Sequence, residues 1–212
     1  MDRVCYLSFA CLSNDEAEFC QFQHANLICS LYQSLEQYHH LILELQPFRA
    51  LVYIQGQQAA FLKSVGAGDV NSTCRELKVY SKIQPASFSE LINTCRLLGV
   101  VHIPSSGRIV GLLLSYIESN NETLLCMGKK PQYISMRQKW LTQTTQSVEA
   151  LHVCGAVWGD VKPDNVLIDT QYDAYLIDFG GGYTRGWVDK ESANTAKGDL
   201  QGLQRIYEFL FG

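Results

Sequence analysis

Apolar residues in the first half of the chain fall mainly in short runs of the kind that form strands. Residues 50–54 and 59–64 are two such runs, separated by a Gln-Gly-Gln turn at 55–57. Residues 100–103 and 108–117 are two more, joined by a turn that contains proline and glycine. Short β-rich runs separated by turn residues are typical of hairpins, so this half is predicted to contain a sheet.

Helical spacing, in which apolar residues recur every three or four positions, occurs in both halves of the chain. In the first half it predicts helices over residues 26–45, 72–83 and 87–98. In the second half it predicts helices over residues 136–153 and 198–210.

Two short apolar runs, 166–168 and 174–177, lie between the last two predicted helices and are followed by a glycine-rich loop at 180–186. Strands mixed with helices in the first half, followed mostly by helices in the second, indicate an α+β protein with two lobes. The predicted organisation is an N-terminal extension with a helix (1–46), a small β-rich lobe and hinge (47–118), and a shortened helical lobe (119–212).

The composition of the chain limits the kinds of molecule that it is expected to bind. The 212 residues are 47% hydrophobic and carry a net charge of −4, which supports a core but no nucleic-acid partner, since that needs clustered Lys and Arg. No apolar run approaches the roughly 20 residues that span a bilayer, so no membrane partner is expected. The apolar stretch 4–12 is too short to favour a secretory signal. The eight scattered cysteines suit a reducing, intracellular location, cytoplasmic or nuclear.

Two polar motifs lie between the last two predicted helices: V-W-G-D-V-K-P-D-N at 157–165 and I-D-F-G at 177–180. The first motif alone is also explained by a turn with a proline and a capping Asn. The second motif follows it after two apolar runs, and this spacing predicts a hairpin that returns the chain to one cleft. Together the motifs resemble the catalytic loop and the metal-binding loop of the protein-kinase superfamily.

This resemblance implies transfer of the γ-phosphoryl group of ATP with Mg²⁺ as the second cofactor. Magnesium prefers hard oxygen ligands, and the resemblance assigns that role to Asn165 and Asp178. It assigns Asp160 as the group that accepts or orients the proton of the acceptor hydroxyl. Lys162 would offset the charge of the transferring phosphate, and Phe179 and Gly180 would complete the metal-binding loop as structural residues.

Upstream, the A-F-L-K sequence that ends at Lys63 resembles the strand motif whose lysine contacts the α- and β-phosphates. Glu76 would be the helix glutamate that pairs with this lysine, with Glu90 as the alternative. By themselves, a surface lysine on a strand edge and a solvated helix glutamate explain the same residues.

Four residues at the end of the predicted strand 108–117 lie where the family contacts adenine: Leu114, Ser115, Tyr116 and Ile117. Leu114 would line the pocket, and the backbone of the other three would meet the adenine edge. A buried strand with nothing bound predicts the same residue types.

The sequence departs from the family pattern in four respects. No glycine-rich loop precedes Lys63, and the hairpin in its place would join 41–46 to 50–54 around Pro47. Trp158 and Gly159 replace the usual His-Arg pair, so no receptor for an activation-loop phosphate is evident. The Ala-Pro-Glu sequence and the later helices are missing. Asp199 resembles the buried aspartate that holds the catalytic loop, although a first-turn aspartate of a helix explains it equally.

Three functions follow in order of preference. The first is a serine/threonine-type protein kinase, similar to divergent fungal kinase-like proteins. The second is a kinase of the aminoglycoside phosphotransferase type that acts on a small hydroxyl-bearing molecule, which Gly159 favours. The third is a pseudokinase that serves as an interaction module, although a scaffold has no need for the four polar groups Lys63, Asp160, Asn165 and Asp178.

Overall fold

The computed structural model describes residues 5–6, 42–45, 51–54, 58–66, 68–84, 90–102 and 109–212. The chain divides into two compact units that do not follow chain order. The first unit contains Met1–Asn71 and Arg96–Tyr116, and the second contains Ser72–Cys95 and Ile117–Gly212.

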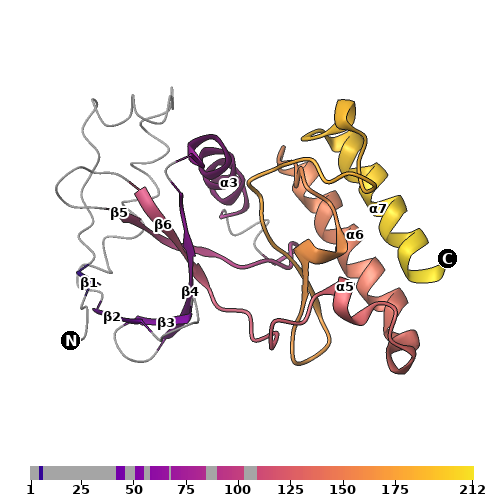
Figure 1. Ribbon diagram of the computed structural model, residues 1–212, viewed down its shortest axis with the longest axis horizontal. Coiled ribbons are helices and arrows are strands. Elements are labelled where there is room, and N and C mark those ends of the chain that lie inside the picture. Colours follow the sequence, from indigo (N-terminus) through magenta and orange to yellow (C-terminus); the bar gives the residue numbers. More distant parts are fainter. Residues whose placement is uncertain are drawn as a thin grey trace. The chain divides into compact units, whose positions relative to one another are not determined.

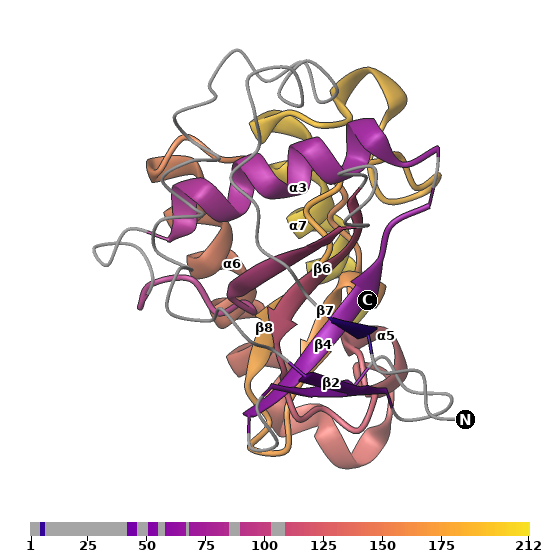
Figure 2. The ribbon, with the colours of Figure 1, turned by 90° about the vertical axis from the view of Figure 1, so that its left-hand side faces the viewer.

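The first unit contains a six-stranded sheet in the order β1-β2-β3-β4-β6-β5, in which all neighbours are antiparallel. Its strands are β1 (Cys5–Tyr6), β2 (Ile42–Leu45), β3 (Leu51–Ile54), β4 (Gln58–Ser64), β5 (Leu97–His102) and β6 (Ile109–Ser115). Figures 1 and 2 show β4 beside β6, where Lys63 lies opposite Leu112. Val52, Ala60 and Leu113 are fully buried and form the centre of this unit's core.

The predicted hairpins are confirmed by the pairing of β3 with β4 and of β5 with β6. The hairpin expected in place of a glycine-rich loop is also confirmed, since β2 pairs with β3. The connecting residues 46–50, 55–57 and 103–108 lie outside the described residues.

Two helix predictions are wrong. Residues 42–45 form β2 rather than the end of a helix over 26–45. A short apolar run is compatible with either a helix or a strand, and here β3 supplies the hydrogen bonds of a strand. Residues 26–41 lie outside the described part. Residues 90–96 are not helical, and Leu97 begins β5. Thr94 instead forms a bridge with Leu176, whose carbonyl accepts from its Oγ1 at 2.6 Å. Glu90 is therefore not on a helix.

The second unit is mainly helical. It contains nearly all of α3 (Val70–Ile83), the short α5 (Leu124–Met127), α6 (Arg137–Val153), α7 (Ala196–Phe211), the hairpin β7 (Val166–Ile168) with β8 (Ala174–Leu176), and the 3-10 turns η3 (Pro131–Met136), η4 (Pro163–Asn165) and η5 (Lys190–Ser192). The helices predicted over 72–83, 136–153 and 198–210 are confirmed to within two residues at each end. A sheet in the first unit and helices in the second confirm the α+β class.

Helix α6 is the packing centre of the second unit, because it contacts both α7 and β8 (Figure 1). Trp140 of α6 is fully buried, and its indole N–H donates to the carbonyl of Tyr172 at 3.0 Å. Helix α7 begins at the N-cap Thr195, whose Oγ1 accepts from the N–H of Gly198. Within the described residues, no helix combines the length and apolar character needed to cross a membrane.

Candidate active site

The loop that follows α6 is held to α7 by one buried carboxylate. Asp199, in the first turn of α7, is 1% exposed and accepts from the backbone N–H groups of Trp158 (2.9 Å) and Gly159 (2.8 Å). His152 Nε2 lies 2.9 Å from the same carboxylate. Hydrogen bonds to a buried charge stabilise by about 1.5–3 kcal/mol each, so Asp199 fixes the backbone from which Asp160 projects. Gly159 makes this path possible with a φ of +90°.

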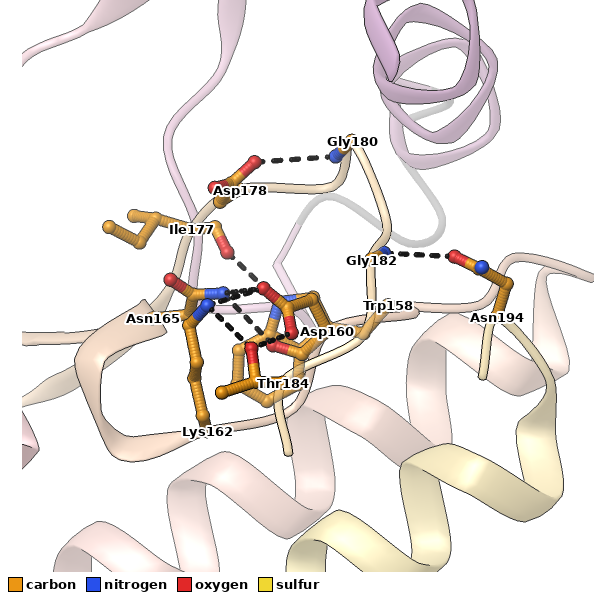
Figure 3. Close-up of polar contacts among 10 residues, drawn as sticks. All are labelled: Trp158, Asp160, Lys162, Asn165, Ile177, Asp178, Gly180, Gly182, Thr184 and Asn194. Atoms are coloured by element: carbon orange, nitrogen blue, oxygen red, sulfur yellow. Dashed lines mark hydrogen bonds and ion pairs between the residues drawn. The ribbon is translucent and has the colours of Figure 1, made fainter. Parts of the chain in front are cut away.

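Asp160 is the acceptor on which the polar side chains of the loop converge (Figure 3). Its Oδ2 accepts from Lys162 Nζ at 2.6 Å and from Asn165 Nδ2 at 3.1 Å. Its Oδ1 accepts from Thr184 Oγ1 at 2.9 Å, and Thr184 in turn accepts from Lys162 at 3.0 Å. The side chains therefore hold one another in a closed network around a carboxylate that is 8% exposed.

Asn165 and Asp178 are brought to adjacent backbone positions by the hairpin between them. The carbonyl of Asn165 accepts from the N–H of Ile177 at 3.0 Å, one residue before Asp178. The indole N–H of Trp158 donates to the carbonyl of Ile177 at 2.9 Å, which fixes the other edge of that residue. Asp178 has a φ of +62°, so its backbone is in the left-handed region that residues other than glycine seldom adopt.

The orientation of Asn165 suits a metal ligand. Its Nδ2 donates to the backbone carbonyl and the carboxylate of Asp160, so its Oδ1 points away from Asp160 (Figure 3). One amide oxygen and the carboxylate of Asp178 match the hard donors that Mg²⁺ prefers, with phosphate and water oxygens as the remaining ligands. In the described part of the chain, His, Cys, Asp and Glu form no group of three or more that could bind a metal.

Phe179 and Gly180 form the buried start of the turn after Asp178. Phe179 is fully buried and meets Tyr80 of α3 edge to face, with ring centroids 5.4 Å apart. The Tyr80 hydroxyl lies 3.0 Å from Cys95 Sγ. Burial raises the pKa values of both Tyr80 and Cys95, so the hydroxyl and the thiol of this pair are uncharged at neutral pH.

The remaining predicted residues lie on other elements. Lys63 is half-buried on β4, and Leu114 (buried) and Ser115 (half-buried) lie on β6 of the first unit, followed by the exposed Tyr116. Ile117 begins the next segment of the second unit. Glu76 is 2% exposed on α3, and its pairing with Lys63 stays a prediction. The residues that the structure brings together are the loop residues of the second unit.

Three residues of this region were not anticipated from the sequence: Thr184, Arg75 and Asn194. Thr184 stands in an irregular loop 24 residues after Asp160, so no periodicity or spacing marks it. Arg75 and Asn194 are 119 residues apart, and their hydrogen bond depends on tertiary packing alone. An exposed arginine on a helix and an asparagine in a loop are ordinary surface residues when viewed in sequence.

Comparison with known proteins identifies the family that has this fold and this arrangement of loop residues. The family model of the protein kinase domain matches residues 57–201, about two thirds of the chain. The chain belongs to the protein kinase domain family, so the predicted resemblance is confirmed.

Similar proteins are serine/threonine kinases, at low identity and over part of their length. A probable serine/threonine-protein kinase of Fowlpox virus is 33% identical over 69 residues, which cover 32% of this chain and 23% of that protein. The serine/threonine-protein kinase PKH3 of Eremothecium gossypii is 30% identical over 112 residues, 47% of this chain and 15% of that protein. The zebrafish (Danio rerio) serine/threonine-protein kinase pim-2 is 30% identical over 88 residues, 34% and 28% respectively. The chain thus matches less than a third of the length of each of these relatives.

Proposed function

We propose that the chain is an ATP- and Mg²⁺-dependent phosphotransferase that modifies Ser or Thr hydroxyls of a protein. The observation that carries the proposal is the convergence of Lys162, Asn165 and Thr184 on Asp160. A buried carboxylate with donors on both oxygens is positioned to accept a proton along a defined direction. Membership of the kinase family and the names of its relatives support a protein as the acceptor.

In the proposed reaction, the acceptor oxygen forms a bond to the γ-phosphorus while the bond from that phosphorus to the β–γ bridging oxygen breaks. Asp160 receives the proton of the acceptor hydroxyl, and ADP leaves. Lys162, whose Nζ lies 2.6 Å from Asp160 Oδ2, supplies positive charge beside the transferring group. Asn165 and Asp178 would hold magnesium, which when bound neutralises charge on the phosphate oxygens.

Residues outside the network around Asp160 enter the proposal from the sequence. Lys63 is proposed to contact the α- and β-phosphates, and the strand end from Leu114 to Ile117 is proposed to meet adenine. The division into an extension (1–46), a β-rich lobe (47–118) and a helical lobe (119–212) belongs to the same proposal.

Nucleotide binding is tested first, by a thermal-shift titration of the whole chain with ATP in the presence and absence of MgCl₂. Saturation at a hundredfold excess over Kd should stabilise the protein by about 2.7 kcal/mol. Asp178→Asn should weaken the magnesium-dependent part of the shift. The absence of any shift would favour the pseudokinase alternative.

Transfer is tested by incubation with labelled ATP and either generic protein substrates or amino sugars and amino alcohols. Asp160→Asn should retain nucleotide binding but lose about 10²- to 10⁴-fold in transfer, the usual contribution of a general base. Labelling of small molecules but not proteins would replace the protein-kinase proposal with a small-molecule kinase. Full transfer by Asp160→Asn would refute the role given to Asp160.

A further inference from the structure

Three consecutive glycines follow Phe179, and a Cβ on either of the first two would meet side chains of neighbouring segments. A Cβ on Gly180 would overlap Ser72 Oγ of α3. A Cβ on Gly181, which has a φ of +70°, would overlap both Arg75 Nη1 of α3 and Asn194 Oδ1. The structure shows a turn whose backbone is packed closely against a helix and a second loop.

Hydrogen bonds join the same three segments. Arg75 Nη1 donates to the carbonyl of Gly180 at 3.5 Å and also to Asn194 Oδ1. Asn194 Oδ1 accepts in addition from the N–H of Gly182 at 3.0 Å (Figure 3). The turn is therefore hydrogen-bonded at its first glycine to Arg75 and at its third to Asn194, and these two side chains are hydrogen-bonded to each other.

This turn connects two groups of the candidate site. Asp178 precedes it and Thr184 follows it, and both carry polar atoms that the proposed chemistry uses. Asp178 has a positive φ, which residues other than glycine seldom adopt, so its backbone conformation needs support from its surroundings.

We propose that Arg75 and Asn194 are positioning residues that clamp residues 180–182 and thereby fix the carboxylate of Asp178 for magnesium. The guanidinium of Arg75 bonds two neutral oxygens, so the clamp closes without a phosphate on this loop. Because Arg75 belongs to α3, the clamp also ties the turn to that helix. The metal-related part of the inference rests on the proposed function, whereas the clamp itself does not.

The clamp is tested directly by the hydrogen-exchange rate of the Gly182 amide, measured by NMR on the whole chain without nucleotide. Loss of one hydrogen bond corresponds to about a 5- to 10-fold increase in exchange rate. Asn194→Ala and Arg75→Ala should each produce that increase. Asn194→Asp keeps an acceptor oxygen for both donors and should preserve slow exchange.

Arg205→Ala is the matched control, since Arg205 is also an exposed helical arginine and its guanidinium donates to Glu208 of its own helix. It should leave Gly182 exchange unchanged. Circular dichroism identifies any variant that fails to fold. If Arg75→Ala does not fold, Asn194→Ala still tests the clamp, because Asn194 is exposed. Unchanged exchange in a folded Asn194→Ala protein would overturn the clamp.

The functional consequence is tested by the Mg²⁺ concentration that half-saturates the ATP-induced thermal shift. Arg75→Ala and Asn194→Ala should raise this midpoint about 3- to 10-fold, and Asn194→Asp should restore it, a pattern that general destabilisation would not give. Faster Gly182 exchange with an unaltered midpoint would overturn the link to Asp178. If the natural protein binds no Mg-ATP, the proposed function is refuted. Faster Gly182 exchange in the variants would then still support the clamp.

Discussion

Thr184 reaches the carboxylate of Asp160 from a loop with no regular structure. Its hydroxyl donates to Asp160 Oδ1 and accepts from Lys162 Nζ, so it bridges the two residues to which the proposed chemistry assigns the proton and the charge. Because the hydroxyl fixes the direction of both side chains, Thr184 acts in this network as a positioning residue.

Thr184→Val keeps the shape of the side chain and removes the hydroxyl. Loss of a hydrogen bond to a charged group corresponds to about 1.5–3 kcal/mol, so kcat for phosphoryl transfer should fall about 10- to 100-fold. The KM for ATP should change far less. Steady-state kinetics check both values, and Thr184→Ser should recover most of the rate. A Val variant as fast as the natural protein would show that the hydroxyl has no positioning role.

At this scale the sequence predicts the residues of short motifs and misses those that tertiary packing adds. Asp160, Lys162 and Asn165 are separated by five positions at most, so one loop presents them together. Thr184, Arg75 and Asn194 join the region through contacts across 12 to 119 residues of sequence. No local pattern encodes such separations, which explains why these three were missed.

Helix α7 packs closely against the loop of Asp160 at Gly202. A Cβ at this position would lie 2.5 Å from Val161 Cβ and 3.0 Å from the Val161 carbonyl oxygen, neither of which is a flexible side-chain end. Glycine is thus required for helix and loop to pack at this distance. The same helix carries Asp199, so α7 supports the loop both by contact and by hydrogen bonds.

Gly202→Ala should destabilise the second unit despite the better helix propensity of alanine. Overpacking costs about 1–3 kcal/mol, and the gain in propensity offsets at most about 1 kcal/mol of it. Urea unfolding measures the difference in the free energy of unfolding. Gln204→Ala, at an exposed position of the same helix, should change stability by less than about 0.5 kcal/mol. Equal stability of the two variants would show that the contact relaxes without strain.

The turn between β7 and β8 is held to α6 through Asp173. Hydrogen bonds from Lys139, at 2.8 Å, and from Gln143 lower the pKa of the Asp173 carboxyl. A group whose pKa is lower in the folded state stabilises the protein above its unfolded pKa. That stabilisation is lost as the pH falls through the folded pKa.

Asp173→Asn should therefore lower the free energy of unfolding at neutral pH, by up to about 1 kcal/mol for a partly exposed ion pair. The difference between the two proteins should shrink as the pH falls below the ordinary carboxyl pKa. Urea unfolding at a series of pH values measures it. In a Lys139→Ala background the pH-dependent part should be much smaller, and a difference that persists unchanged into acid would contradict the ion-pair account.

Several element types were predictable because the periodicity was long or a partner run lay nearby in sequence. The 17 residues of α6 and the hairpin of β3 with β4 meet these conditions. The segment 90–98 does not, because Thr94 pairs with Leu176, 82 residues away, and Leu97 with Leu114 of β6. Helical spacing of a few apolar residues is a weaker influence than backbone hydrogen bonds to distant strands.

For the whole molecule, the compact units differ from a simple division of the sequence. Ser72–Cys95 groups with the C-terminal part rather than with the strands that flank it in sequence. The contacts responsible are those of Arg75 with Gly180, Tyr80 with Phe179 and Thr94 with Leu176. The turn that follows Asp178 is therefore supported by α3 within one unit, whereas Lys63 belongs to the other.

Lys63→Met tests whether ATP binding draws on the first unit. Methionine keeps the apolar stem of the side chain and removes the charge. Loss of a charged contact to phosphate should raise the Kd for Mg-ATP about 10- to 100-fold, and isothermal titration calorimetry measures it. Lys197→Met, at an exposed lysine of α7, is the control and should bind as the natural protein does. If Lys63→Met also binds normally, the phosphates are held without Lys63, and the prediction based on its strand motif is wrong.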